Sequence, residues 1–186
     1  MALTATIHHL ELALSDVDRN VYETLDLRLA RHPSETLRYM LTRTLAYALS
    51  YEEGIAFSKG GLSQTDEPPI SVVDLTGVML AWIDVGNPSA DRLHKASKLA
   101  RRVSLYTHVE MSVLRKEAAT RNIHRIEDIE VFRFAPAMLD ALESKVDRKM
   151  KFELVRTDDQ LYFTWGGETI EGRVERHRLV DQETAG

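Results

Sequence analysis

An aspartate that closes an unusually apolar strand is the first residue of this sequence that could do chemistry. The run Val78-Met79-Leu80-Ala81-Trp82-Ile83 carries no charge, and Asp84 follows it directly, before Val85-Gly86-Asn87-Pro88 and a basic helical pattern. Such a run is typical of a central strand in an α/β sheet, where both faces are covered. Sites are often built where a strand of this kind ends. Asp84 is therefore the first candidate site residue.

A metal is the natural partner of such a carboxylate, because Mg²⁺ is usually bound through one or two carboxylates together with waters and substrate phosphates. The second acid must come from a neighbouring segment. If Thr76-Gly77 is a two-residue turn, Asp84 lies opposite Pro69 in the hairpin. Asp74 would then be ~17 Å away along the strands. The predicted register therefore sets Asp74 aside.

The step Asp66-Glu67 lies just beyond the residue that would face Asp84. We predict that Asp66 or Glu67 is the second acid, with the choice between them open. The alternative for this step is a plain turn before the prolines that follow it. The alternative for Asp84 is a carboxylate that merely caps its loop.

If a phosphate is the substrate, a positively charged side chain should lie near these acids. Arg92 and Lys95 lie in the first two turns of the helix predicted after Asp84, and Lys95 is the candidate catalytic ammonium. Lys95 also lies ~160° from the apolar stripe of that helix, as a solvated surface lysine would. Glu35 is a candidate accessory metal ligand, and pairing with the positive end of a helix is its alternative role.

Other catalytic patterns are missing from the sequence. It has no cysteine, so thiolate metal sites and disulfides are excluded. Its seven histidines include no His-x3-His pair that would indicate zinc on one helix. No Gly-x-Ser-x-Gly elbow, Walker loop or Gly-x-Gly-x-x-Gly fingerprint is present. The acids around Asp84 are thus the main chemical signal.

The elements that must position these residues follow from hydrophobic periodicity. Two alternating runs, 4–14 and 21–29, predict an antiparallel hairpin. The remaining pattern predicts a helix from His32-Pro33-Ser34-Glu35 to about Tyr51, a strand at 55–59, the hairpin 70–75 and 78–85, a helix from Ser89, a strand at 103–109, a helix at 110–121, a strand at 129–134, a helix at 136–145, and a meander of strands at 149–156, 161–165 and 169–179. The fold class is α/β (α+β).

Composition narrows the class of protein. The chain has 186 residues, 44% hydrophobic and 28% charged, which predicts a single domain over 1–186 with a frayed end at 181–186. The net charge of −5 argues against a broad basic face for coating nucleic acid. No run is long enough to span a membrane, and the first residues do not resemble a signal peptide. These features predict a cytoplasmic protein, with its oligomeric state left open.

Several short motifs, in order along the chain, carry a resemblance to a known family. They are Met1-Ala2-Leu3, Arg31-His32-Pro33-Ser34-Glu35-Thr36, Phe57-Ser58-Lys59-Gly60, Asp66-Glu67-Pro68, Trp82-Ile83-Asp84-Val85-Gly86, Arg92 and Lys95-Ala96. Together they resemble the YaeQ family of bacterial proteins. The resemblance implies a variant of the restriction-endonuclease-like PD-(D/E)xK core, at about 33–109, with a mixed sheet, an added N-terminal hairpin and a C-terminal meander.

The resemblance also implies roles for the candidate residues. In the PD-(D/E)xK superfamily, two acids and a lysine form a Mg²⁺-dependent phosphodiesterase site. The resemblance implies that Asp84 takes the (D/E) position here, and that Asp66 or Glu67 is the first acid. The superfamily lysine is replaced by Gly86, so Lys95 would have to supply the ammonium from a shifted position. Two hypotheses follow: a nuclease that uses Mg²⁺ or Mn²⁺, or an inactive module of the same fold that binds a protein or nucleic-acid partner.

Overall fold

The structure is a computed structural model and describes residues 4–59 and 66–180. The chain forms two compact units, Met1–Tyr51 with Phe134–Val174, and Glu52–Arg133 with Glu175–Gly186. We call them the first and the second unit. The predicted frayed end at 181–186 and the glycines after Lys59 lie outside the described residues.

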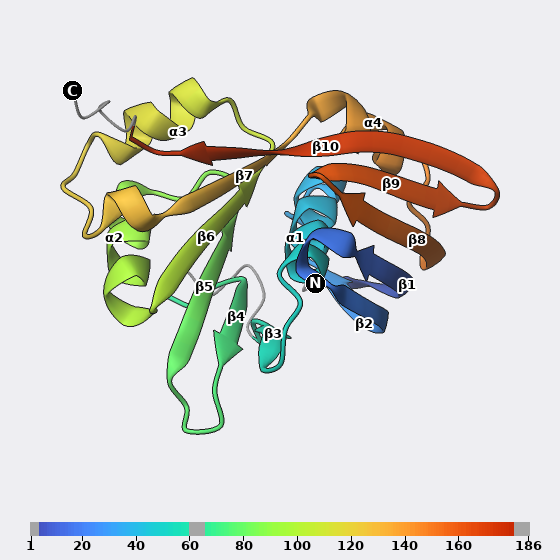
Figure 1. The fold of residues 1–186 in the computed structure, drawn as a ribbon, viewed down its shortest axis with the longest axis horizontal. Helices are drawn as coiled ribbons and strands as arrows, with labels where there is room; N and C mark the ends of the chain where they lie inside the picture. Colours follow the sequence, from blue (N-terminus) through green and yellow to red (C-terminus); the bar gives the residue numbers. More distant parts are fainter. Residues whose placement is uncertain (1–3, 60–65, 181–186) are drawn as a thin grey trace. The chain divides into compact units, whose positions relative to one another are not determined.

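The first unit is built on the strand order β2-β1-β8-β9-β10 (Figure 1). Strands β1 (Thr6–Asp16) and β2 (Val21–Arg31) form the predicted antiparallel hairpin, in an unbroken register from Asp16↔Val21 to Thr6↔Arg31. β1 is also parallel to β8 (Lys149–Thr157). β8, β9 (Gln160–Trp165) and β10 (Glu168–Arg178) form the predicted antiparallel meander. Both predictions are confirmed.

Alternation along these strands buries one face of the sheet. Buried side chains of this face include Leu10, Leu12 and Leu14 of β1, Leu25, Leu27 and Leu29 of β2, and Met150, Phe152 and Leu154 of β8. Helix α1 (Leu37–Leu49) packs against α4 (Pro136–Glu143), and Arg38 of α1 forms ion pairs with Asp140 and Glu143 of α4. Among the described residues, the chain has four α-helices and an α+β fold with mixed strand pairing.

The second unit follows the order β7-β6-β5-β4-β3, with the end of β10 in the same unit (Figure 1). β3 (Ile55–Phe57), β4 (Ile70–Val73) and β5 (Met79–Val85) are antiparallel. β5, β6 (Arg102–Thr107) and β7 (Glu130–Phe134) are parallel, with α2 (Ala90–Leu99) between β5 and β6, and α3 (Met111–Ala118) between β6 and β7. β5 is thus a central strand, and every residue from Ala81 to Val85 is buried, as the apolar run predicts.

The start of the first helix is predicted wrongly. The helix begins at Leu37 with Thr36 as its N-cap, and the Thr36 hydroxyl accepts a hydrogen bond from the backbone N–H of Tyr39. Residues 33–35 form a turn in front of the helix, because the side chain of Glu35 folds back to the N–H of His32. Glu35 is therefore outside the first helical turn.

The turn between β4 and β5 also differs from the predicted two-residue turn. The Gly77 N–H donates to the carbonyl of Asp74, and Gly77 has φ +87, so the loop has three residues with glycine in the left-handed position. A register shift between Val72 and Val73 absorbs the extra residue. Ile70 still faces Ile83, which keeps the predicted alignment next to Asp84. The short strand predicted at 55–59 ends at Phe57.

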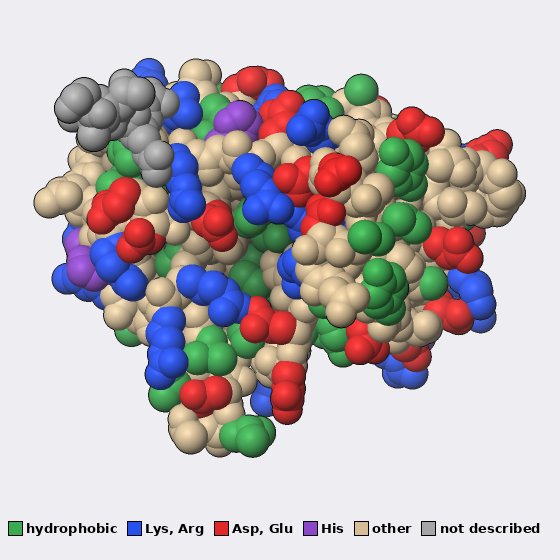
Figure 2. All heavy atoms as spheres, in the orientation of Figure 1, with side chains coloured by type: hydrophobic (Ala, Val, Ile, Leu, Met, Phe, Trp, Pro, Cys, Tyr) green, Lys and Arg blue, Asp and Glu red, His purple; other side chains and the backbone are tan. Residues whose placement is uncertain are grey.

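Charged side chains of both signs are interspersed over the face of the molecule in Figure 2, and no broad basic area appears there. This agrees with the net charge of −5. No helix of the described residues is both long and apolar enough to cross a membrane.

Candidate functional site at the end of β5

Asp84 lies at the carboxyl end of β5, on the side of the sheet that α2 covers. Strand residues two apart point to the same face, so Asp84 shares its face with Trp82. Trp82 packs in one hydrophobic cluster with Leu93 of α2. Asp84 is 2% exposed, although it carries a charge. A buried carboxylate is costly unless it is paired and hydrogen-bonded, so its partners decide what it can do.

Three donors surround the Asp84 carboxylate. Its Oδ2 accepts a hydrogen bond from Arg92 Nε at 2.6 Å and another from Trp82 Nε1 at 3.0 Å. Its Oδ1 accepts one from the Val85 N–H at 3.1 Å. The Arg92 guanidinium also lies 5.4 Å from the centre of the Trp82 ring, within range of a cation–π contact. The carboxylate is thus a satisfied, charge-paired acceptor.

The position of Arg92 is unusual for a cation. It lies in the first turn of α2, where the Ser89 hydroxyl accepts its backbone N–H, and where the helix dipole disfavours positive charge. Asp84 offsets this cost. The far end of the side chain donates from Nη2 to the carbonyl of Glu67 at 2.8 Å, so Arg92 joins the end of β5 to the segment before β4.

The structure brings the other predicted acids near this arrangement, but with their carboxylates engaged elsewhere. Lys95, one turn beyond Arg92 on α2, forms an ion pair with Asp66 at 2.7 Å, and these side chains are 42% and 88% exposed. The hydrogen bond from Lys95 lowers the pKa of the Asp66 carboxyl. The Glu67 carboxylate accepts a hydrogen bond from the Ser58 hydroxyl at 3.1 Å.

Glu35, the predicted accessory ligand, belongs to the first unit and is 4% exposed. Its Oε1 accepts a hydrogen bond from Arg43 Nε at 3.1 Å, and its Oε2 accepts the N–H of His32 at 3.2 Å. The carboxylate therefore joins α1 to the turn that precedes it. This is a structural pairing of a buried acid with a buried base.

The donor set around Asp84 does not fit a divalent cation. Mg²⁺ needs oxygen ligands in near-octahedral geometry, and here a guanidinium lies 2.6 Å from one carboxylate oxygen while N–H groups occupy further lone pairs. Within the ranges that the structure describes, no group of three or more His, Asp or Glu side chains could hold a metal ion.

The position that the resemblance assigns to the superfamily lysine has a backbone reason to be glycine. Gly86 has φ +85, and its N–H donates to the Tyr106 carbonyl at 2.9 Å as the chain leaves β5. A residue with a Cβ is strained in this conformation. The glycine is therefore part of how the chain turns from β5 towards α2.

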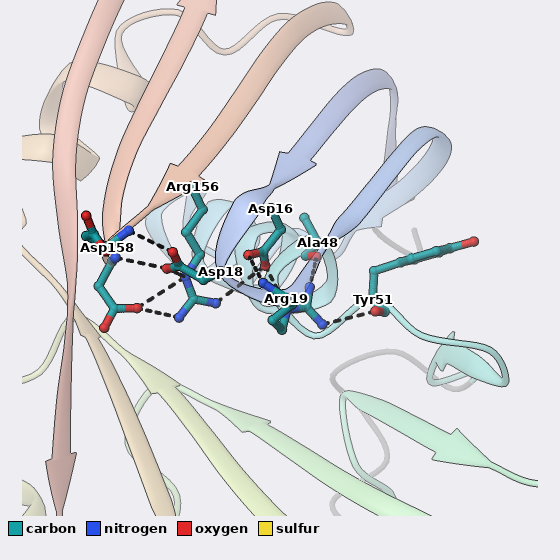
Figure 3. A network of polar contacts seen from close by, with 8 residues as sticks. Asp16, Asp18, Arg19, Ala48, Tyr51, Arg156 and Asp158 are labelled. Carbon is teal, nitrogen blue, oxygen red and sulfur yellow. Dashed lines mark hydrogen bonds and ion pairs between the residues drawn. The ribbon is translucent and has the colours of Figure 1, made fainter.

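Sequence patterns did not indicate a second polar cluster, which lies in the first unit and has Asp16 and Arg156 as its buried members (Figure 3). Its centre is Arg156 at the end of β8, which is 3% exposed and forms ion pairs with Asp16, Asp18 and Asp159. Asp18 also accepts the backbone N–H groups of Asp158 and Asp159 at 2.7 and 3.0 Å. Both residues of this turn have positive φ, so the acceptor holds a strained turn in place.

Arg19 extends the cluster towards α1. Its Nε forms an ion pair with Asp16 at 2.7 Å, and its Nη1 and Nη2 donate to the carbonyls of Tyr51 and Ala48 (Figure 3). The donors therefore satisfy carbonyls at the C-terminal end of α1, where cations are favourable. The contacts of this cluster fasten a hairpin turn and a helix end, which is a structural role.

Comparison with known proteins places the chain in a family. A family model described as YaeQ protein matches residues 1–174. The chain belongs to the YaeQ family. The YaeQ protein of Escherichia coli (strain K12), which is described as uncharacterized, is 40% identical over 109 residues. The protein of Shigella flexneri that bears the same description matches equally. The matched part is 58% of this chain, and the chain spans 59% of the length of these relatives.

Solved structures of YaeQ proteins share the fold. The crystal structure from Pseudomonas syringae is 32% identical, with a TM-score of 0.81 over 92% of this chain and 95% of that chain. The structure from Xanthomonas axonopodis pv. citri is 29% identical, with a TM-score of 0.83 over 94% of this chain and 99% of that chain. The resemblance to the YaeQ family is thus confirmed, and the α+β architecture is that of YaeQ structures.

Proposed function

We propose that this YaeQ chain is a non-hydrolytic variant of the PD-(D/E)xK fold that acts as a binding module for a protein partner. The observation that carries the proposal is the pairing of Asp84 with Arg92 at 2.6 Å, in the position where a nuclease of this fold would hold its metal. The carboxylate is used to fix α2 and the Glu67 segment, so it serves the architecture of the second unit.

Two further features support the loss of hydrolytic chemistry. The positive φ of Gly86 opposes a lysine at the superfamily position. The two nearby cations on α2, Arg92 and Lys95, are each neutralised by a carboxylate, so neither offers an uncompensated charge to a phosphodiester. With a net charge of −5, this favours a protein partner over nucleic acid.

The first test is calorimetric titration of the purified protein with Mg²⁺ and Mn²⁺, followed by assays on single- and double-stranded DNA and RNA. We expect no saturable binding of either metal and no cleavage above that of the Asp84→Ala variant. If the protein shows metal-dependent cleavage, and if Asp84→Ala and Lys95→Ala each abolish it, the proposal is contradicted and the protein is a nuclease.

The partner is tested by photo-crosslinking in cells from a crosslinking residue placed at the exposed Asp66. We expect one discrete protein adduct that survives nuclease treatment and that a crosslinker at the exposed Glu171 of β10 does not form. An adduct that disappears after nuclease treatment, or identical adducts from Asp66 and Glu171, would contradict the proposal of a protein-binding module.

A Mg²⁺-dependent nuclease is the second candidate function. One observation favours it: the contacts of α2 gather Asp84, the Asp66-Glu67 step and Lys95 around a single helix end. The titration and the two substitutions above distinguish the two candidates directly.

A further inference from the structure

The strand β2 ends the strand order of the chain and offers an unusually regular edge. It has eleven residues, contains no proline, glycine or lysine, and keeps an unbroken register with β1. The strand at the other end of the order, β3, has only three residues. Proteins usually protect exposed edges with short strands, bulges, proline or charged side chains. Of these devices β2 has only the charged side chains, which are Glu23, Asp26, Arg28 and Arg31.

The charges of this strand have no counterpart within the described part of the chain. Asp26 and Arg28 are exposed, and neither they nor Glu23 and Arg31 form an ion pair there. The cross-strand neighbour of Asp26 is the like-charged Glu11, whose own partner is a lysine of β8. The exposed charges of Asp26 and Arg28 are therefore available to a partner outside the described fold.

The spacing of these charges is self-complementary. If two copies of β2 pair antiparallel about a two-fold axis at Leu27, Asp26 faces Arg28 of the second copy and Arg28 faces its Asp26. Glu23 then faces Arg31 of the second copy, and the reverse. Each Leu25 faces a Leu29, so the buried leucines stay on the core side of both sheets.

Neighbouring registers lack this complementarity. An axis at Asp26 places the two Asp26 carboxylates opposite each other, and an axis at Arg28 does the same with two guanidinium groups. Like charges directly opposite each other destabilise a strand pair. The sequence of β2 thus selects one register out of three and disfavours its neighbours.

We propose that β2 is the interface of a two-fold dimer, in which it pairs antiparallel with β2 of a second copy of this chain in the register centred on Leu27. The charge pattern selects a second copy as the occupant of the edge, because the same strand supplies both halves of every ion pair. Backbone hydrogen bonds along the edge provide the affinity, and the four ion pairs fix the register.

The test uses sedimentation equilibrium of the full chain and of charge-reversal variants. We expect a concentration-dependent dimer of twice 21.2 kDa, weakened by salt. Asp26→Arg or Arg28→Asp alone should each raise the dimer Kd by about tenfold or more, because the two-fold axis turns two ion pairs into two repulsions. The double variant should return to within about threefold of the wild type.

A mixture of the two single variants gives the sharpest outcome. Asp26→Arg carries two arginines and Arg28→Asp two aspartates, so the mixture should form a heterodimer while each variant alone is mainly monomeric. The control is Glu171→Arg/Arg173→Asp, which exchanges the same kinds of exposed charge on β10 and should leave the dimer unchanged. Circular dichroism confirms that every variant is folded.

Three outcomes would overturn the proposal. If the wild-type chain stays monomeric at high concentration, β2 does not pair with a second copy, and its edge binds another protein or faces solvent. Single variants that dimerise like the wild type place the interface elsewhere. A double variant or a mixture that does not recover dimerisation shows that the register is wrong.

Discussion

The Asp84–Arg92 pair can be tested through stability, independently of any activity. The perturbation is Arg92→Met, which keeps an apolar stem over Trp82 and removes the guanidinium. It leaves a carboxylate that is 3% exposed with two neutral donors. If the pair is structural, this change should lower stability strongly, whereas an acid kept available for a ligand should lose little.

The magnitude follows from the burial of the pair. Breaking a buried ion pair by removing one partner costs about 3–5 kcal/mol, because the other charge is left uncompensated. The Arg92 side chain is 19% exposed, so water can solvate part of the carboxylate. We therefore expect a loss of about 3 kcal/mol, at the lower end of that range. This corresponds to a fall in Tm of about 9 °C for a chain of this size.

The assay is urea unfolding followed by circular dichroism, with three comparison variants: Lys95→Met, Asp84→Asn and Asp84→Asn/Arg92→Met. Lys95→Met removes a cation one turn further along the same helix, from an exposed pair, and should cost far less stability than Arg92→Met. Asp84→Asn/Arg92→Met should be less destabilised than Arg92→Met alone, because no charge is left buried. Two results would refute the structural role: a loss of unfolding free energy for Arg92→Met no larger than that for Lys95→Met, or a gain in stability for Asp84→Asn. Either would indicate that Asp84 is kept for binding a ligand at the expense of stability.

Two other predictions concern single positions. A hydrogen bond from the Asp159 N–H is the main cause that lowers the pKa of Asp18 below its ordinary value of 3.8. The ionised Asp18 therefore contributes stability above pH 3.8, and this contribution is lost as the pH falls through the lowered pKa. Asp18→Asn should flatten the dependence of stability on pH in this acid range, and an unchanged acid unfolding curve would contradict the assignment. Gly54 and Gly77 have φ +86 and +87, but of the two only Gly54 lies where a Cβ would collide with a backbone atom, the Val73 oxygen. Gly77→Ala should therefore cost about 1 kcal/mol and Gly54→Ala about 2 kcal/mol more, measured by urea unfolding, and equal costs would show that the contact relaxes.

Elements with a clear period were predictable from the sequence, whereas their ends were not. The alternation in residues 4–29 and the apolar run before Asp84 correspond to β1, β2 and β5, since burial of a whole face imposes these periods. The start of α1 was missed because Thr36 and Pro33 both fit a helix N-terminus, and only the fold of the Glu35 side chain decides between them.

The candidate site shows a different limit of sequence reasoning. The spacing located the segments correctly, because α2 must begin close to the end of β5 and the register places the Glu67 segment beside it. The spacing could not assign the partner of each charge. Arg92 and Lys95 are three residues apart on α2, and both are within reach of the acids. In the structure Arg92 pairs with Asp84, and Lys95 pairs with Asp66.

Local rules that the sequence breaks are the better guide to this site. An arginine in the first turn of a helix opposes the dipole, and an aspartate in a buried strand opposes solvation, so each is unfavourable alone. Their hydrogen bond at 2.6 Å resolves both conflicts, and Gly86 turns the chain so that α2 can begin beside the strand end. A nuclease with the usual superfamily lysine at this position would need the acid open to metal and a lysine where φ is positive. As a structural unit the three residues are consistent with one another, and the substitution at Arg92 tests this role without depending on an activity assay.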